Sequence, residues 1–475
     1  MDSEFYKKEN LQANDLITSI SHKQFGEIID VLTDYHANGS YETLREHVIL
    51  LDYPEFAHMV RITDLIKDDF EKDVINITKN AYEHLSKTKL YGGEILINKI
   101  GTYAGQSFLM PNVKRPSSLG MNIFMLRLKK GFSSKLYQIF LLTKIGKTLI
   151  DQKISGASPK SIDKESVREV TVPIFSNSFQ ECIENLIDEA QNLKQVQKEA
   201  FLRAEEFLLK QLGLKNFQTS KEPVNVKSFS ESFGTSGRLD AEYYQKKYDE
   251  IIEIIQSKHH DKISNLVKIQ KSIEPGSKEY QDEGIPFYRV ADIDKQGLSK
   301  PDKYLSESYV SALKAIYKKR NEGKTDEEKE YIIPKKGTIL FSKDGSIGKA
   351  YKLREDLDGM SSGALLHLTI KDSRIDPDYL TLVLNSLPIQ MQAERDAGGS
   401  IIQHWRINEI ENVVVPLIQK EKQEQIAEFI NESFDLKQQS EHLLEIAKRA
   451  VEHAIEKGEE TALAYIKSET IKFEK

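Results

Sequence analysis

The segment GTILFSKDGSIGKAY (residues 337–351) places a glycine-rich loop directly after a short β-branched strand, and it decides the architecture because the chain contains it twice. In the first half, GEILINKIGTYAG (residues 93–105) repeats the strand, the lysine and the glycines, with Lys99 in the place of Lys343. A β-branched run bounded by glycine is typical of a strand that ends in a turn. The repetition suggests that a much larger part of the chain is duplicated.

Further matches follow in the same order along both halves. They are DSEFYKK with DAEYYQK (2–8 and 240–246), GSYE with GSKE (39–42 and 276–279), RITD with RVAD (61–64 and 289–292), SGAS with AGGS (155–158 and 397–400), and VTVP with VVVP (170–173 and 413–416). Matches in a common order predict an internal duplication. The copies differ by extra residues, LREHVILLDYPEFAHM (44–59) in the first and the charged KKRNEGKTDEEKE (318–330) in the second. Such insertions are typical of surface loops.

A long helical pattern follows the proline that ends each half. Apolar residues recur every three or four positions from 178 to 212, before Gly213, and from 420 to about 456, before Gly458. This spacing predicts two amphipathic helices, each ended by a glycine. Each helix would extend roughly 50 Å and carry an apolar stripe that needs a partner. We expect the two helices to pair as an antiparallel coiled coil; the alternative is that each packs on its own half alone.

The expected fold class is therefore α+β, with two globular domains that form a pseudo-two-fold internal repeat and two long antiparallel helices that join them. Strands such as ILFS and LLHLTI alternate with short helices at 133–145 and 377–387. The expected organisation is a first globular domain at 1–177, a central helix at 178–213, a second globular domain at 214–418, a C-terminal helix at 419–458 and a tail at 459–475.

Composition places the chain among soluble folded proteins of more than one domain. It has 475 residues, of which 39 % are hydrophobic and 30 % are charged. The net charge of −7 argues against a uniformly basic nucleic-acid binder. Residues 91–170 nevertheless carry 13 Lys and Arg against 5 Asp and Glu. A single cysteine, Cys182, and the lack of an apolar membrane or signal segment lead us to expect a cytoplasmic protein.

Three stretches together suggest a family. RLDAEYY (238–244), GTILFSKDGSIG (337–348) and GGSIIQHWRINEIENVVVPLIQKEKQEQI (398–426) carry the resemblance, with the order of globule, long helix, globule and long helix. The whole chain resembles the specificity (S) subunit of type I restriction-modification systems. In the first half the corresponding loop is SGASPKSIDKESV (155–167), which lacks the glutamine of the second copy.

The resemblance implies a DNA-reading subunit without chemistry of its own. Each globular domain would be a target recognition domain that reads one half of a split double-stranded DNA sequence. The paired helices would set the spacing and dock two DNA methyltransferase (M) subunits, and the resemblance leaves open whether ATP-dependent restriction (R) subunits join them. No cofactor is expected in this chain, because S-adenosylmethionine would bind to the methyltransferase partner.

DNA reading needs cations for phosphates and hydrogen-bonding side chains for base edges, held on loops of a rigid scaffold. Glycine in such loops lets the backbone approach a phosphate closely. The alternative for each residue is a plain hairpin turn with solvated lysines. The candidate DNA-binding residues are Lys99, Thr102, Tyr103, Lys114, Arg115, Ser158 and Lys160 in the first half, and Ser277, Lys278, Lys343, Ser346, Lys349, Ser400, Gln403, His404 and Arg406 in the second.

Enzymatic interpretations find little support in the sequence. LLTKIGKTL (141–149) has Leu141 where a phosphate-binding loop needs its first glycine. The sequence has no cysteine pair and no close histidine cluster for zinc, so we expect no metal site, and the resemblance implies no catalytic residues. The remaining alternative is a coiled-coil interaction scaffold without a DNA-reading function, which the acidic net charge would suit.

Overall fold

The computed structural model describes residues 7–220, 222, 224–325, 329–330, 332–398 and 403–473. The chain divides into two compact units. Unit 1 combines residues 1–194 with residues 438–475, and unit 2 is residues 195–437. The division falls within both long helices, so each unit contains one part of each helix. Within the described ranges, none of the helices is long and apolar enough to cross a membrane.

Unit 1 contains a two-stranded sheet and two four-stranded sheets. Its strands are β1 (His22–Gln24), β2 (Ile29–Asp34), β3 (Ala57–Val60), β4 (Ile75–Ile77), β5 (Lys89–Leu90), β6 (Ile95–Asn98), β7 (Ser107–Leu109), β8 (Ser117–Leu119), β9 (Ile123–Leu128) and β10 (Thr171–Pro173). Its short helices are α1 (Lys8–Thr18), α2 (Phe25–Ile28), η1 (Tyr35–Asn38), α3 (Tyr41–His47), α4 (Ile62–Lys67), α5 (Lys79–His84), η2 (Ser86–Thr88), α6 (Ser134–Leu142), α7 (Lys144–Asp151) and α8 (Lys164–Arg168).

Unit 2 has the same kinds of sheet and a further two-stranded hairpin. Its strands are β11 (His260–Lys262), β12 (Val267–Lys271), β13 (Tyr280–Gln281), β14 (Ile285–Tyr288), β15 (Ile293–Asp294), β16 (Gly297–Leu298), β17 (Tyr304–Leu305), β18 (Ile339–Ser342), β19 (Ala350–Lys352), β20 (Met360–Ser361), β21 (Leu365–Ile370) and β22 (Val414–Pro416). Its short helices are α10 (Phe233–Ser236), η3 (Ala241–Tyr244), α11 (Lys246–Gln256), α12 (Ile263–Leu266), η4 (Ser277–Glu279), η5 (Val290–Asp292), α13 (Glu307–Arg320), α14 (Pro377–Leu384), α15 (Leu387–Asp396) and α16 (Ile407–Ile410).

The strand orders confirm the internal duplication. The first four-stranded sheet is β2-β9-β6-β7 in unit 1 and β12-β21-β18-β19 in unit 2, and both are antiparallel throughout. The second sheet is built on a parallel pair, β3 with β8 in unit 1 and β14 with β20 in unit 2. The strands β6 and β18, predicted from the repeated segment, are buried at every position, as expected for central strands with covered faces.

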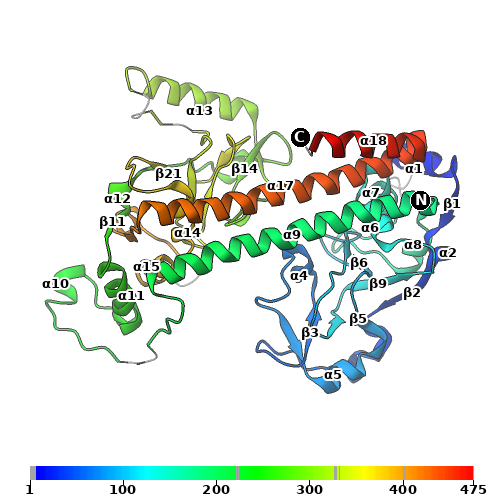
Figure 1. The fold of residues 1–475 in the computed structure, drawn as a ribbon, viewed down its shortest axis with the longest axis horizontal. Coiled ribbons are helices and arrows are strands. Elements are labelled where there is room, and N and C mark those ends of the chain that lie inside the picture. The colour runs from blue at the N-terminus through cyan, green and yellow to red at the C-terminus, as the bar shows by residue number, and fades with distance from the viewer. Residues whose placement is uncertain are drawn as a thin grey trace. The chain divides into compact units, whose positions relative to one another are not determined.

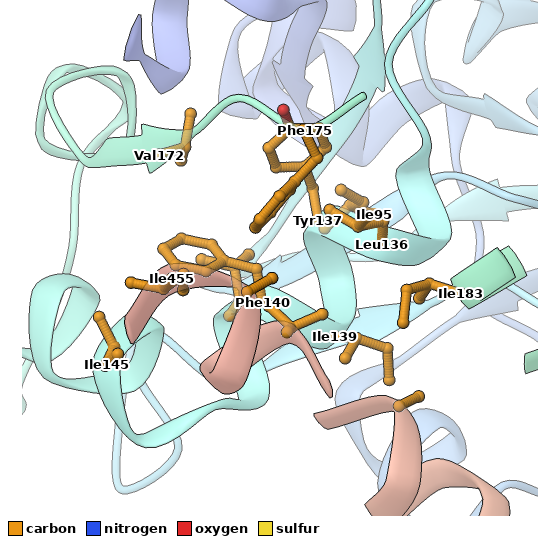
Figure 2. Packing of buried hydrophobic residues seen from close by; sticks show 14 of the residues in the cluster. Ile95, Leu136, Tyr137, Ile139, Phe140, Ile145, Val172, Phe175, Ile183 and Ile455 are labelled. Carbon is orange, nitrogen blue, oxygen red and sulfur yellow. The ribbon is translucent and has the colours of Figure 1, made fainter. Parts of the chain in front are cut away.

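The core of unit 1 joins its first sheet to the long helices. Figure 2 shows Leu136, Tyr137 and Phe140 of α6 among side chains from the strands and from both long helices. Ile183 and Ile455 belong to the same buried cluster. Burial of apolar surface contributes about 25 cal/mol per Å², so the helix segments and the sheet stabilise one another within this unit.

An equivalent hydrogen bond fixes the strand before each long helix. Tyr137 Oη donates to the carbonyl of Pro173 at 3.0 Å, and Tyr379 Oη donates to the carbonyl of Pro416 at 2.8 Å. Both tyrosines are fully buried, and burial raises the pKa of each phenol. The paired prolines end the VTVP and VVVP repeats, so the duplication extends to buried side-chain contacts.

The two long helices are α9 (Asn177–Leu212) and α17 (Lys420–Lys457). They confirm the predicted helices, and each is followed by a glycine in the left-handed region, Gly213 at φ +73° and Gly458 at φ +88°, where glycine is favoured. A further helix, α18 (Glu459–Phe473), lies where the sequence indicated a tail. Its residues Ala462 and Ile466 join the core of unit 1.

The long helices pair antiparallel within each unit (Figure 1). In unit 1, Ser440 Oγ donates to the carbonyl of Ala190 at 2.7 Å; in unit 2, Ser433 Oγ donates to the carbonyl of Gln197 at 3.1 Å. Within unit 2, Gln197 bonds to Ser433 and Phe207 packs against Phe429, so rising residue numbers on α9 meet falling numbers on α17, which is the antiparallel register. The expected coiled coil is therefore present, rather than two helices that each pack on a globular half alone.

The predicted short helices differ in one respect from those in the structure. Each is a pair of consecutive helices, α6 with α7 and α14 with α15. In unit 1 the break follows from Thr143, whose Oγ1 accepts from the backbone N–H of Gly146 at 3.0 Å and so caps a new helix.

Candidate nucleic-acid interface

In unit 2, the repeated loop after β18 is joined to the loop before α16. The backbone N–H of Gly345 donates to the carbonyl of Gln403 at 2.9 Å, and the N–H of Trp405 donates to the carbonyl of Lys343 at 2.8 Å. Trp405 is 1 % exposed and packs against Phe341, with ring centroids 5.7 Å apart. The buried tryptophan therefore anchors a surface formed by two chain segments that are distant in sequence.

Unit 1 builds the equivalent pair of loops with the same bonds. The N–H of Gly101 donates to the carbonyl of Lys160 at 2.9 Å, and the N–H of Ile162 donates to the carbonyl of Lys99 at 2.9 Å. The φ of Gly101 is +92°, which glycine adopts readily and other residues rarely do. We call each arrangement the paired loops: residues 99–105 with 155–162 in unit 1, and 343–349 with 403–406 in unit 2.

Asp34 holds Lys99 of the unit 1 paired loops in an ion pair. Lys99 Nζ lies 2.7 Å from Asp34 Oδ2, and Lys164 Nζ lies 2.8 Å from Asp34 Oδ1. Burial alone would raise the pKa of the Asp34 carboxyl, but the bonds from Lys164 and Lys99 outweigh it and hold that pKa below its ordinary value. Lys99 also lies over the ring of Phe124, 5.0 Å from its centroid. Its ammonium group is thus engaged by the scaffold.

In unit 2, a carboxylate likewise forms an ion pair with the lysine of the paired loops. Asp344 forms an ion pair with Lys343 and accepts at Oδ1 from His404 Nδ1 at 2.8 Å. These contacts fix the orientation of the His404 side chain, which is 63 % exposed to solvent. The sequence did not identify Asp34 and Asp344 as ion-pair partners of the loop lysines. Asp344 directly follows Lys343 in the sequence, whereas nothing in the sequence connects Asp34 to Lys99.

Several other candidates also have partners on the scaffold. Lys349 Nζ donates to the carbonyl of Ile293 at 3.5 Å, and Arg115 donates to the carbonyl of Glu55. The Arg406 backbone N–H donates to the Glu409 side chain at 3.0 Å, and the Arg406 side chain is 75 % exposed, with its Nε 3.9 Å from Glu409 Oε1. Arg406 thus presents a cation at the start of α16 whose backbone is held in position.

The remaining candidates lie at the surface. Ser400 lies outside the described residues. Lys114, with Arg115, precedes β8, and Ser277 and Lys278 lie on η4 before β13, so their chain positions adjoin the second sheets rather than the paired loops. The exposed candidates are Thr102, Tyr103, Lys114, Ser158, Lys160, Ser277, Lys278, Ser346, Gln403, His404 and Arg406.

The exposed groups of the paired loops suit contact with a polyanion and with base edges. Lys160 and Arg406 supply cations, while Ser158, Ser346 and Gln403 supply neutral donors and acceptors. Arginine and glutamine are the side chains that make two-pronged contacts to guanine and adenine. The backbone beneath them is fixed by hydrogen bonds within each unit, which reduces the entropy lost on binding.

One serine–histidine pair lies buried in unit 2. Ser361 Oγ lies 2.6 Å from His367 Nε2, but these residues are 0 % and 3 % exposed. Burial lowers the pKa of His367 to about 4, so the pair is neutral and inaccessible to a substrate. Among the described residues, no three His, Cys, Asp or Glu side chains are grouped so that they could hold a metal ion.

Comparison with known proteins places these features in context. The family model described as the type I restriction modification DNA specificity domain matches residues 255–446. No curated protein matches the chain. The S subunit of a type I restriction-modification system from M. genitalium is 12 % identical, with 92 % of this chain and 95 % of that chain covered and a TM-score of 0.39. The HsdS subunit from Thermoanaerobacter tengcongensis is 13 % identical, with 92 % and 96 % covered and a TM-score of 0.28.

Proposed function

We propose that this chain is a specificity subunit of a type I restriction-modification system that reads a bipartite DNA target, because the family model described as the type I restriction modification DNA specificity domain matches residues 255–446. The matched residues contain the unit 2 paired loops. Unit 1 reads one half of the target and unit 2 reads the other. The observation that carries this proposal is the duplicated set of backbone bonds, Gly101 to Lys160 and Gly345 to Gln403, each at 2.9 Å.

The exposed side chains of the paired loops support different half-sites. Unit 1 presents Thr102, Tyr103 and Lys160, whereas unit 2 presents Ser346, Gln403 and Arg406. One backbone arrangement with different side chains reads different bases, because phosphate contacts position the protein and base contacts specify the sequence. A duplicated scaffold with unlike surfaces therefore suits a target with two unequal halves.

The partners that this function implies are DNA and a DNA methyltransferase. We propose that two methyltransferase subunits dock on the coiled coil of α9 and α17 and that S-adenosylmethionine binds to them rather than to this chain. The chain itself contributes no chemistry, and the complex works in the cytoplasm.

Exchange of one recognition domain tests the assignment. Residues 1–177 are replaced by those of a related specificity subunit. The apolar residues that pack against Phe179 and Ile183 of α9 are retained, so that the core of unit 1 still packs against this helix. Expressed with its methyltransferase, the hybrid is expected to methylate a sequence in which one half-site has changed and the other has not. The reciprocal exchange of residues 214–418 is the matched control and should change the other half-site alone.

The outcomes separate the proposal from its competitor. If the first exchange altered both half-sites, the two units would not read separately. If the complex bound DNA with no dependence on sequence, and affinity did not fall as salt increased, an interaction scaffold would be favoured, because phosphate contacts weaken steeply with salt. Methylation by this chain without a partner would contradict its role as a non-catalytic subunit.

A further inference from the structure

Helix α13 of unit 2 is a longer form of a helix in unit 1. In unit 1, α5 has 6 residues and its N-cap Thr78 accepts from the N–H of Ala81 at 3.3 Å. In unit 2, α13 has 14 residues and its N-cap Ser306 accepts from the N–H of Tyr309 at 3.2 Å. Both helices follow a strand of the second sheet, β4 or β17. They start alike, and α13 continues for about two more turns.

One face of α13 packs on its unit. Val310 is 2 % exposed, and Leu313 and Tyr317 pack against the same apolar cluster, which contains Phe287 of the second sheet. The spacing of three and four residues is that of a helix with a single buried stripe. The orientation of α13 on unit 2 is therefore fixed, and so is the face that it turns to solvent.

The solvent face of the extension is basic. Lys314, Lys318 and Lys319 are exposed, and none has an ion pair, hydrogen bond or ring contact with the described residues. Arg320 lies beside Tyr317, with its guanidinium carbon 5.2 Å from the ring centroid. All of these cations lie beyond the turns that α5 shares. The chain as a whole has a net charge of −7, so this face is an exception to the overall balance.

Helix stability does not account for all of these cations. Lys318 and Lys319 lie in the last turn, where cations complement the helix dipole. Lys314 lies earlier, and like charges at positions i and i+4, as in Lys314 and Lys318, destabilise a helix slightly. Elsewhere in unit 2, Lys247 and Lys335 lie 2.8 Å from the acidic groups of Glu394 and Asp356. Three exposed lysines that lie close together on α13, without a partner among the described residues, thus suit contact with a polyanion.

We propose that the solvent face of α13 contacts the phosphate backbone of DNA beside the half-site that unit 2 reads. This proposal rests on the proposed function and adds to it a contact that unit 1 lacks. A lysine is a flexible point charge that suits phosphates, so α13 contributes affinity and position, not base identity. The exposed Lys278 lies on η4, next to Tyr280, which packs on the same apolar cluster as Tyr309 of α13. Lys278 is thus a further predicted cation on a segment that packs against the same cluster as α13.

The test uses the complex of this chain with its methyltransferase and the triple variant K314Q/K318Q/K319Q. Glutamine preserves helix propensity, so the thermal unfolding midpoint should not change. DNA affinity is measured over a series of salt concentrations on a duplex with the methylated target. Each lost phosphate contact lowers the slope of log affinity against log salt by about 0.9, so the slope should fall by about 2 to 3, with roughly 100-fold weaker binding at 0.1 M salt. The methylated sequence should remain the same.

A matched control separates location from net charge. The variant K215Q/K336Q/K371Q removes the same charge from exposed lysines elsewhere in unit 2 and should retain the wild-type slope. The single variant K314Q should lower the slope by about 1, which a role in the helix dipole would not produce.

Three results would overturn the proposal. They are an unchanged slope in the triple variant, an equal fall in the control, and loss of methyltransferase assembly with a normal slope, which would assign the face to the protein partner. In each case the wild-type complex still reads its sequence, so the proposed function survives. If the wild-type complex itself showed no sequence-specific binding, that result would refute the proposed function. The proposal for α13 would then be refuted as well, because it rests on that function.

Discussion

Removal of the buried tyrosine hydroxyls should destabilise each unit to a similar extent. In the variants Tyr137→Phe and Tyr379→Phe, the carbonyls of Pro173 and Pro416 lose the donors that lie 3.0 and 2.8 Å away. In the two-stranded sheets, Pro173 lies opposite His22 and Pro416 lies opposite His260. At these positions the proline carbonyl points away from the neighbouring strand. No cross-strand donor therefore replaces the lost one.

The magnitude follows from the burial of both groups. A typical hydrogen bond contributes about 1 kcal/mol, and a buried acceptor left without a donor costs about 1–3 kcal/mol. We expect each variant to lose about 2 kcal/mol of unfolding free energy. With a urea dependence of about 2 kcal/mol per M, the midpoint should fall by roughly 1 M. The two sites are in different units, so the losses in the double variant should add to within about 0.5 kcal/mol.

The assay can assign each loss to its unit. Trp405 is the single tryptophan of the chain and is buried in unit 2, so its fluorescence follows the unfolding of that unit, while circular dichroism follows both. Tyr53→Phe is the control, because Tyr53 is 55 % exposed, and it should change stability by less than about 0.5 kcal/mol. A loss below that value in either buried variant would refute the claim that these hydroxyls hold the strands before the long helices.

Three further predictions address the loops and a buried carboxylate. Burial alone would raise the pKa of Asp64, but bonds from His58 and Arg61 lower it to about 2. The ionised carboxylate therefore stabilises the fold above about pH 4, and this stabilisation is lost as pH falls toward 2. The variant Asp64→Asn should cost about 2 kcal/mol of unfolding free energy at pH 7 and progressively less in unfolding experiments at lower pH. Gly348→Ala should reduce the melting temperature more than Gly345→Ala, because both have positive φ but only the first places a Cβ 2.8 Å from Gln390. Lys99→Gln should lower stability with little change in the salt dependence of DNA binding, whereas Lys160→Gln should lower the salt slope by about 1 and leave thermal unfolding unchanged.

The repeated architecture could be predicted because its signals are local and occur twice. The apolar spacing of α9 and α17 extends over many turns, and a glycine follows each helix. The strands β6 and β18 are apolar runs that end at a glycine-rich loop. Such patterns depend on neighbouring residues, so a single sequence contains them.

Other features depend on contacts between distant residues. The pairing of Lys99 with Asp34 joins β2 to a loop, and no spacing in the sequence reports it. The charged segment after 318 indicated an insertion, but not that α13 precedes it as a helix with a defined solvent face. The helix α18 was missed because its burial depends on the core of unit 1, which residues far upstream supply.

Unit 1 is built from the two ends of the chain, and this affects how it is made. The ribosome releases the first part of α9, with Phe179, Ile183 and Ala190, long before Leu443 and Val451 of α17, which share its core. At about 5–20 residues per second, that apolar stripe remains uncovered for some tens of seconds. Truncated products that lack residues 438–475 would keep it exposed permanently and become targets for chaperones and proteases. Incomplete copies would thus be removed from the cell before they could compete for methyltransferase subunits.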